Sequence, residues 1–457
     1  MLTTTEIEAA AMPQHVLGTF TTLADGVATL VLRSHKATTI CIDWKGGSHS
    51  VESYAVANKL ETLEVPTYAG AQCTVYGYSA EEPLYVFSLR DAKLADVDLS
   101  EMKQLAWVNF RASESRSQAC LDYAERSRKS QSNVSGAGID AIKLPDTDTL
   151  VELILANNKF SQLNLSRYAG QLHLLTLNNN QFTEFDATPF KQVFSLNLAN
   201  NLLESVQLDN PDMWNLDLSG NQLKQIDVTK VPELNQLFLT NNQLSELDLT
   251  AQKGLHALHV DGNRFTFSTL PLPNSQYGSY QYGQQANIDI VVDKMGRVDL
   301  SSEAQVGQVA TTYRWFVGTP WYDENSGELT GEELYINEEY TLEDGVTKFL
   351  SPIDNVVCAL LNEQFPNLTL YTNPVNVTTV DAIRGVEVAE GVQLQGRTAA
   401  KAAVSAWRLR PDSSSPSTTP ADSRWAAYSS RAAPVPSTWH NPVSTWFAAA
   451  KRPRRLW

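Results

Sequence analysis

Two stretches near the middle of the chain align residue for residue and decide the fold. Residues 213–228 read MWNLDLSGNQLKQIDV, and residues 234–249 read LNQLFLTNNQLSELDL. Both have apolar residues at positions one, four, six and eleven and an asparagine at position nine. The pattern occurs six times in succession, and its asparagines are separated by 22, 21, 20, 21 and 21 residues. A fixed period of this length indicates a chain organised by stacked repeats.

The repeat predicts a leucine-rich-repeat solenoid of parallel β-strands with a period of about 21. Residues at positions four and six of a short strand point to one face, and the residues between them point to the other. One repeat cannot bury its apolar face alone, so we expect successive repeats to stack into one sheet over a leucine core. The asparagines would pair with backbone groups at the turn after each strand. We predict this structural ladder at Asn158, Asn180, Asn201, Asn221, Asn242 and Asn263.

The solenoid is expected to span residues 84–274. A weaker form of the pattern begins at residue 84, and its phase is lost over residues 114–132, which are rich in Ser, Arg and Ala. We expect a surface bulge or poorly ordered coil there. Residues 1–83 alternate loosely between apolar and polar residues, which predicts a β-rich cap over the exposed end of the core. Short strands, turns or 3₁₀ segments, rather than long helices, are expected on the convex side.

The repeats carry a family resemblance. Asn221–Val228 and Asn242–Leu249 follow the form Asn-x-Leu-x-x-Leu-Asp-Leu, with Ile or Val as substitutes. In this the sequence resembles leucine-rich-repeat proteins that Gram-negative anaerobes export to the cell surface. The resemblance covers roughly residues 84–272 with specific motifs and extends to about 380 with vaguer ones. Such proteins are generally adhesins or recognition modules, so the resemblance implies a non-enzymatic binding function with a protein or a glycan as ligand.

A different domain is expected after the repeats. The period disappears after Pro271 and Pro273, and a connector rich in Tyr, Gln and Gly leads into short alternating segments. Their number and spacing over residues 275–380 predict an all-β, immunoglobulin-like sandwich. Trp315 would be its core tryptophan. Cys358 has no partner cysteine in the same domain, so the disulfide of antibody domains is absent from this prediction.

Residues 381–457 are expected to be an irregular basic tail. Residues 396–457 hold ten Lys and Arg against two Asp and five of the ten tryptophans, without strand or helix periodicity. We interpret them as out-of-frame translation or a damaged sorting domain, and a natural basic linker is the alternative. Residues 1–14 lack the basic start and apolar block of a secretory signal. For the extracellular or cell-surface location that the resemblance implies, we therefore expect the leader to lie outside this chain.

Charge and motifs disfavour several classes of function. Apart from the basic end, residues 1–395 hold 25 Lys and Arg against 49 Asp and Glu. This acidic balance disfavours nucleic acid and anionic membranes as partners, and no apolar run is long enough to span a bilayer. Phosphate loops, nucleophile elbows and paired-carboxylate motifs are not found, so we expect neither catalysis nor a cofactor. His256 and His259 should point to opposite faces of a strand, which argues against a metal site.

The expected binding surface is the concave face of the sheet. Residues at strand positions three, five and seven should point away from the leucine core, where they build no part of the fold. The final repeats combine hydrogen-bonding groups with an aromatic side chain, and aromatic residues are common anchors of interfaces. The predicted ligand-binding residues are Trp107, Asn197, Asn215, Asp217, Phe238, His259 and Asp261. The alternative is a structural or assembly component of the cell surface, with the sandwich as its recognition module.

Overall fold

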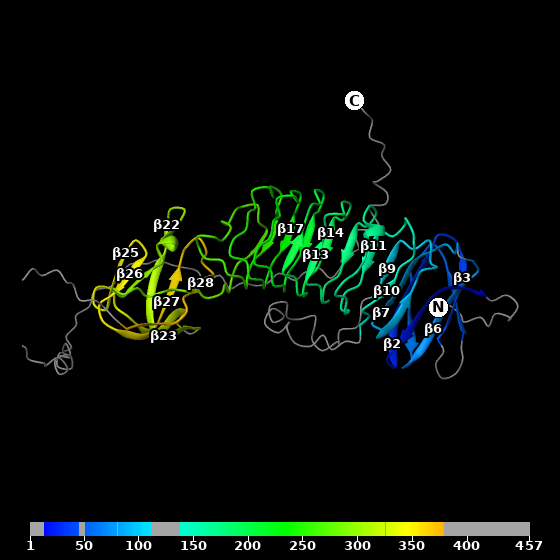
Figure 1. The fold of residues 1–457 in the computed structure, drawn as a ribbon, viewed down its shortest axis with the longest axis horizontal. Coiled ribbons are helices and arrows are strands. Elements are labelled where there is room, and N and C mark those ends of the chain that lie inside the picture. The colour runs from blue at the N-terminus through cyan, green and yellow to red at the C-terminus, as the bar shows by residue number, and fades with distance from the viewer. Residues whose placement is uncertain (1–12, 45–50, 80, 111–137, 325, 379–457) are drawn as a thin grey trace, which may run out of the picture. The chain divides into compact units, whose positions relative to one another are not determined.

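The computed structural model describes residues 13–44, 51–79, 81–110, 138–324 and 326–378. In these ranges the chain forms 29 strands, and its helical elements are two 3₁₀ turns, η1 (Ser166–Tyr168) and η2 (Ser301–Glu303). The parallel strands from β9 to β17 follow one another along the molecule (Figure 1). The interrupted stretch 114–132 and the basic tail 381–457 lie outside the described residues.

The N-terminal strands form two antiparallel layers around an apolar core. One layer has the order β8–β1–β6–β3–β4, and the other begins as β5–β2–β7. Leu30, Ile42 and Phe20 are buried between them, and the Trp44 indole donates to the Tyr54 hydroxyl at 3.2 Å. The bounds are β1 (His15–Thr22), β2 (Gly26–Ser34), β3 (Thr38–Asp43), β4 (Val51–Val56), β5 (Glu61–Thr67), β6 (Ala71–Gly77), β7 (Leu84–Arg90) and β8 (Leu94–Asp98).

Strand β7 joins these layers to a long parallel sheet. It pairs antiparallel with β2 and parallel with β9, so one 11-stranded sheet runs from the N-terminal layers through the repeats. The sheet continues in register, one strand per repeat. Its parallel strands are β9 (Trp107–Asn109), β11 (Glu152–Ile154), β12 (Leu174–Thr176), β14 (Ser195–Asn197), β16 (Asn215–Asp217), β17 (Gln236–Phe238), β18 (Ala257–His259) and β19 (Ser279–Gln281).

The parallel part is a leucine-rich-repeat-like solenoid with the period of about 21 read from the sequence. In the long sheet, the middle residue of each strand from β9 to β18 is fully buried, as Leu216 and Leu237 illustrate. This follows from the alternation of side chains along a strand. The convex side is made of turns, η1, the pair β13 (Glu184–Asp186) and β15 (Ser205–Gln207), and the short β10 (Ile142–Lys143), which pairs with β8.

The six position-nine asparagines make the same set of hydrogen bonds in successive repeats. The Nδ2 of Asn221 donates to the carbonyls of Leu218 (2.8 Å) and of Leu198 in the preceding repeat (3.1 Å), and its Oδ1 accepts from the Leu203 N–H at 3.0 Å. Each side chain therefore joins its own turn to the repeat before it. The other five members bond in the same way, at Asn158, Asn180, Asn201, Asn242 and Asn263.

A second geometry recurs in every repeat, at the residue directly before each ladder asparagine. The residue before each ladder asparagine has φ between 55° and 68°, a left-handed conformation that Asn and Gly adopt most readily. At Gly220 a side chain would also collide, because an added Cβ would lie 2.2 Å from the Oδ1 of Asn200. The Asn-Asn and Gly-Asn pairs in the sequence are the signal of this turn. Its members are Asn157, Asn179, Asn200, Gly220, Asn241 and Gly262.

The solenoid extends by one strand into the expected connector. Gln285 takes the place of a ladder asparagine. Its Nε2 donates to the carbonyls of Val260 and Tyr282, and its Oε1 accepts from the Phe265 N–H. Tyrosines occupy the three leucine positions before it, and β19 pairs in parallel with β18. The repeat period thus persists through residue 285. A search for leucines at the repeat positions misses this copy, because tyrosines and a glutamine occupy them.

The weakest part of the repeat pattern is an insertion within one turn. Strand β9 pairs directly with β11 although 42 residues separate Asn109 from Glu152 in the sequence. The Asn158 side chain bonds both flanks of the gap, to the Phe110 carbonyl at 2.8 Å and to the Ile139 N–H at 3.0 Å. Ile139 therefore stands where other repeats place position eleven, and residues 111–137 lie between.

Antiparallel sheets follow the solenoid. Trp315 on β23 is fully buried, donates to Thr347 Oγ1 at 3.0 Å and faces the Cys358 position on β27. The sheets have the orders β20–β26–β25 and β24–β23–β27–β28, with β29 beside β27. Their strands are β20 (Arg297–Asp299), β21 (Gln305–Val306), β22 (Val309–Ala310), β23 (Thr312–Asp323), β24 (Glu328–Glu333), β25 (Tyr340–Glu343), β26 (Val346–Phe349), β27 (Ile353–Leu361), β28 (Thr369–Tyr371) and β29 (Val375–Val377).

Candidate functional site

The parallel strands present two rows of side chains on the face opposite the leucine core. Strict register places the first residues of the strands side by side, and likewise the third residues, at the strand spacing of about 4.8 Å. The first row is Trp107, Glu152, Leu174, Ser195, Asn215, Gln236, Ala257 and Ser279. The second row is Asn109, Ile154, Thr176, Asn197, Asp217, Phe238, His259 and Gln281.

Strands β14 and β16 form a polar centre in these rows, made of Ser195, Asn197, Asn215 and Asp217. Asn215 Nδ2 donates to Ser195 Oγ at 3.1 Å, and Asn197 Nδ2 donates to Asp217 Oδ2 at 3.4 Å. These bonds orient the side chains before any ligand arrives. Asn215 Oδ1 is buried and has no hydrogen-bond partner among the described residues, so it is an unsatisfied acceptor beneath this surface.

Asp217 is an unfavourable place for a charge. Burial raises the pKa of its carboxyl above the ordinary value, and the hydrogen bond from the Ser219 backbone N–H at 3.1 Å opposes this shift only in part. No lysine or arginine stands in either row between β9 and β19. The carboxylate thus lacks the cationic partner that would offset its desolvation.

An aromatic pair borders the polar centre. Phe238 on β17 contacts His259 on β18 edge to face, with ring centroids 4.8 Å apart, and His259 Nε2 lies 2.9 Å from Ser279 Oγ. His259 differs from the expectation of an outward, accessible residue, because only 8% of it is exposed. The unforeseen strand β19 covers one side of its ring and Phe238 covers the other. Burial lowers the pKa of His259, which favours a neutral imidazole.

The remaining predicted site residues lie at the margins. Asp261 follows β18 and accepts a hydrogen bond from Thr240 Oγ1 at 2.9 Å. Trp107 is half-buried on β9, and β11 and β12 stand between it and the polar centre. The structure therefore brings together five predicted residues on β14, β16, β17 and β18, places Asp261 beside them, and leaves Trp107 apart.

A neighbouring set of residues escaped the sequence analysis. Position two of the repeats, directly before each strand, holds Phe194 and Trp214, which are 41% and 47% exposed. The sequence-based prediction covered only positions three, five and seven of each repeat, so it did not include these two residues. Their signal in the sequence is an aromatic residue inserted beside a buried position-one residue, where nothing in the core requires it.

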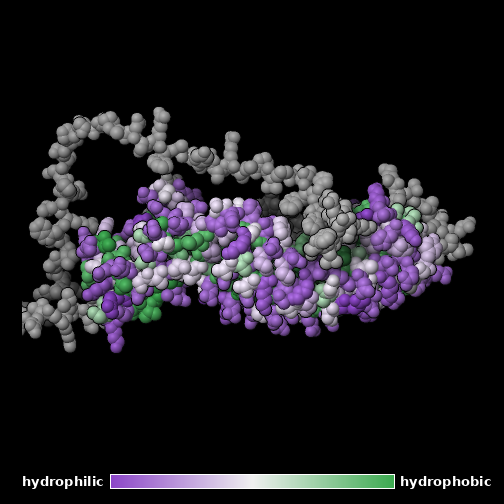
Figure 2. Space-filling model, turned by 90° about the horizontal axis from the view of Figure 1, so that it is seen from above, coloured by the Kyte–Doolittle hydropathy of each residue, from purple (hydrophilic) through white to green (hydrophobic). Residues whose placement is uncertain are grey.

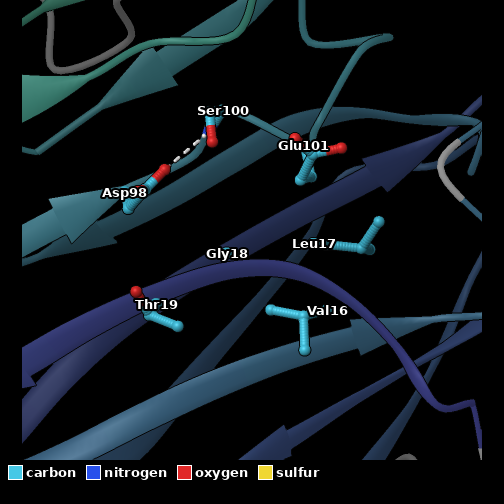
Figure 3. A pocket seen from close by; sticks show the side chains of 7 residues that line it. All are labelled: Val16, Leu17, Gly18, Thr19, Asp98, Ser100 and Glu101. Carbon is cyan, nitrogen blue, oxygen red and sulfur yellow. Dashed lines mark hydrogen bonds between the residues drawn. The ribbon is translucent and has the colours of Figure 1, made fainter.

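The described residues were also searched for a small-molecule pocket, a metal cluster and a membrane-spanning helix. A small pocket between β1 and β8 is lined by Gly18, Asp98 and Glu101 (Figure 3). Its volume of about 130 Å³ is below the roughly 300–1,000 Å³ of small-molecule sites. Groups of three or more His, Cys, Asp or Glu placed to hold a metal are not found in the ranges given above. The same ranges contain no helix long and apolar enough to cross a membrane.

On the face drawn in Figure 2, hydrophobic side chains gather mainly toward one end, and elsewhere they are scattered in small patches among hydrophilic ones. Scattered apolar residues are ordinary on a protein surface and need no partner to explain them. The register and hydrogen bonding of the two outward rows, rather than apolar exposure, distinguish the candidate site.

Comparison with known proteins shows a structural likeness. No protein-family model matches the chain, and no curated protein matches it. Among solved structures, the functional domain of InlJ from Listeria monocytogenes, which includes a cysteine ladder, is similar with 17% sequence identity and a TM-score of 0.31. The match covers 61% of this chain and 64% of that one, so this chain spans less than two thirds of its length. The solenoid assignment rests on the repeat, register and asparagine ladder of the chain itself.

Proposed function

We propose that this protein is a non-enzymatic binding module that recognises a protein or glycan through the outward rows of its parallel sheet. One observation carries the proposal: the polar centre and the aromatic pair lie in register on consecutive strands, on the face that the core does not use. Asp217 in particular is kept where its charge is costly. Groups that are unfavourable for folding and irrelevant to the core are typical of functional surfaces.

The other parts of the chain fit this role. The antiparallel layers before β9 would act as the cap that shields the first repeat, and the sheets around Trp315 would be the immunoglobulin-like sandwich. An extracellular or outer-surface location is proposed with them, as is typical of such binding modules. The resemblance to exported proteins of Gram-negative anaerobes supports this location.

A screen of the purified full chain against matrix proteins and soluble glycans tests the proposal. For the ligand found, the double variant Asp217→Ala with Phe238→Ala should fold normally and lose about 2 kcal/mol or more of binding free energy, as expected for interface anchors. Asp227→Ala on the convex side is the matched control, since Asp227 is exposed and remote from the rows.

A second candidate is a structural component whose sandwich does the recognising. It is favoured by the exposure of Tyr322 and Tyr335, at 63% and 66%, on and beside the β23–β24 hairpin. If the double variant retains full affinity while Tyr322→Ala with Tyr335→Ala abolishes binding, this second function holds and the repeats are a spacer.

A further inference from the structure

An aromatic row borders the polar centre along the edge where the chain enters the strands. Position two of successive repeats holds His173, Phe194, Trp214, Asn235 and His256. Their backbones form a continuous ladder, in which the Phe194 N–H donates to the His173 carbonyl at 3.0 Å and the Trp214 N–H to the Phe194 carbonyl at 2.8 Å. The rings therefore repeat at the strand spacing, like the two rows beside them.

Apolar and hydrogen-bonding groups are paired along this edge. Phe194 directly precedes Ser195 in the sequence, and Trp214 directly precedes Asn215, so each exposed ring belongs to the residue that leads into a member of the polar centre. Ser195, Asn197 and Asp217 are partly exposed, and their hydroxyl, amide and carboxyl groups include both donors and acceptors. A matching ligand presents flat apolar faces to the rings and hydrogen-bonding groups to these side chains.

We propose that the aromatic row and the polar centre together bind a neutral glycan chain laid across strands β14 to β18. This inference rests on the proposed function, because it uses the same face of the sheet. A sugar ring has an apolar C–H face that packs on an aromatic ring and a rim of hydroxyls that both donate and accept hydrogen bonds. A polysaccharide is itself periodic, which suits rows of side chains that repeat with the strands.

The arrangement fits a neutral glycan better than the other ligand classes. A polyanion would need basic residues, and neither the two outward rows nor the aromatic row contains Lys or Arg. Protein interfaces are typically apolar at the centre and polar at the rim. Here the order is reversed, because the charged Asp217 lies centrally and the exposed rings of Phe194 and Trp214 lie at the edge.

Affinity electrophoresis of the full chain through gels containing laminarin, yeast mannan or dextran tests the inference, with heparin as the polyanion. We expect at least one neutral polysaccharide to slow the protein, and heparin to leave it unaffected. Phe194→Ala with Trp214→Ala should weaken that affinity about tenfold or more. Trp214→Phe should retain most of it, because the ring remains. Tyr78→Ala is the matched control, since Tyr78 is a 57% exposed aromatic residue in the N-terminal layers.

Two results would overturn the inference and leave the proposed function standing. One is binding of a matrix protein with no retardation by any neutral polysaccharide. The other is retardation that survives Phe194→Ala with Trp214→Ala but is lost in Asp217→Ala with Phe238→Ala. Retardation unaffected by either double variant would instead contradict both, because the ligand would then bind elsewhere on the chain.

Discussion

Single amide side chains hold this solenoid together at the residue scale. Each ladder asparagine satisfies backbone groups in two repeats at once, and those groups are buried. A buried donor or acceptor without a partner costs about 1–3 kcal/mol. The ladder therefore contributes to stability alongside the leucines, although it contributes no apolar surface.

Replacement of Asn221 by alanine should lower the free energy of unfolding by about 1–3 kcal/mol, because it leaves the Leu203 N–H unpaired and removes one of the two asparagine donors to each of the Leu198 and Leu218 carbonyls. Urea denaturation measures this change. The neighbouring Gln222→Ala, whose side chain makes no ladder bond, should be nearly neutral. Equal urea midpoints for the two variants would show that the Asn221 side chain does not contribute to stability.

Asp217 allows a prediction about pH. Its pKa in the folded protein lies above the ordinary value of 3.8, so the folded state takes up a proton first as the pH falls. The stability penalty of the charge is absent well below pH 3.8. It grows as the pH rises from 3.8 to the raised pKa, and it is complete above that pKa. Asp217→Asn should therefore stabilise the protein at pH 7, and this gain should shrink toward pH 4.

Thermal unfolding at the two pH values measures the effect. Asp227→Asn serves as a control of opposite sign, because hydrogen bonds from Thr229 lower the pKa of Asp227. That variant should show no gain at pH 7. A gain for Asp217→Asn that is the same at both pH values would show that the carboxyl is not the cause. Ligand binding by Asp217→Asn should weaken despite the higher stability.

At the scale of elements, the sequence predicted the strands wherever leucines and asparagines kept their places. It did so because burial at positions four and six and the bonds of position nine both depend on residue type. The last strand escaped prediction since Tyr280 and Gln285 perform the same tasks with other side chains. The misplacement of His259 on an open surface followed from this omission. The pairing order of the N-terminal strands was beyond prediction, because alternation within a strand does not specify its neighbours.

Gln285 should act as the final member of the ladder. Gln285→Ala is expected to raise amide hydrogen exchange at Phe265, which loses its acceptor, and in β18 beside it, while strands β12 and β14 remain protected. Local opening at an end is typical of repeats that contact only their neighbours. Gln281→Ala, an exposed change on β19, is the matched control. Unchanged exchange at Phe265 would mean that the ladder ends at Asn263.

At the scale of the whole molecule, the parallel sheet is continuous across the gap between Phe110 and Ile139, because Asn158 bonds both flanks. Deleting residues 112–135 would leave four residues between Phe110 and Ile139, as between Leu155 and Phe160 in the next repeat. We expect cooperative unfolding with a melting temperature within a few degrees of the full chain. Shortening a loop changes its closure entropy by only about 0.6 kcal/mol per halving.

Calorimetry measures the deletion. A single transition with the original enthalpy would show that the repeats stack without residues 112–135. A loss of about 3 kcal/mol or more, well above the loop-closure effect, would show that those residues contribute to the core. The full chain with Glu114→Ala, a single change inside the same stretch, controls for composition.

The clamp formed by Asn158 also has a practical consequence. A turn that accommodates residues 111–137 between two anchored flanks is a natural grafting point, where foreign peptides of varied length can be displayed without altering the sheet on either side. An epitope or a second binding loop inserted there would emerge immediately after β9, at the end of the solenoid remote from β18. One chain would then carry two independent specificities on a single rigid backbone.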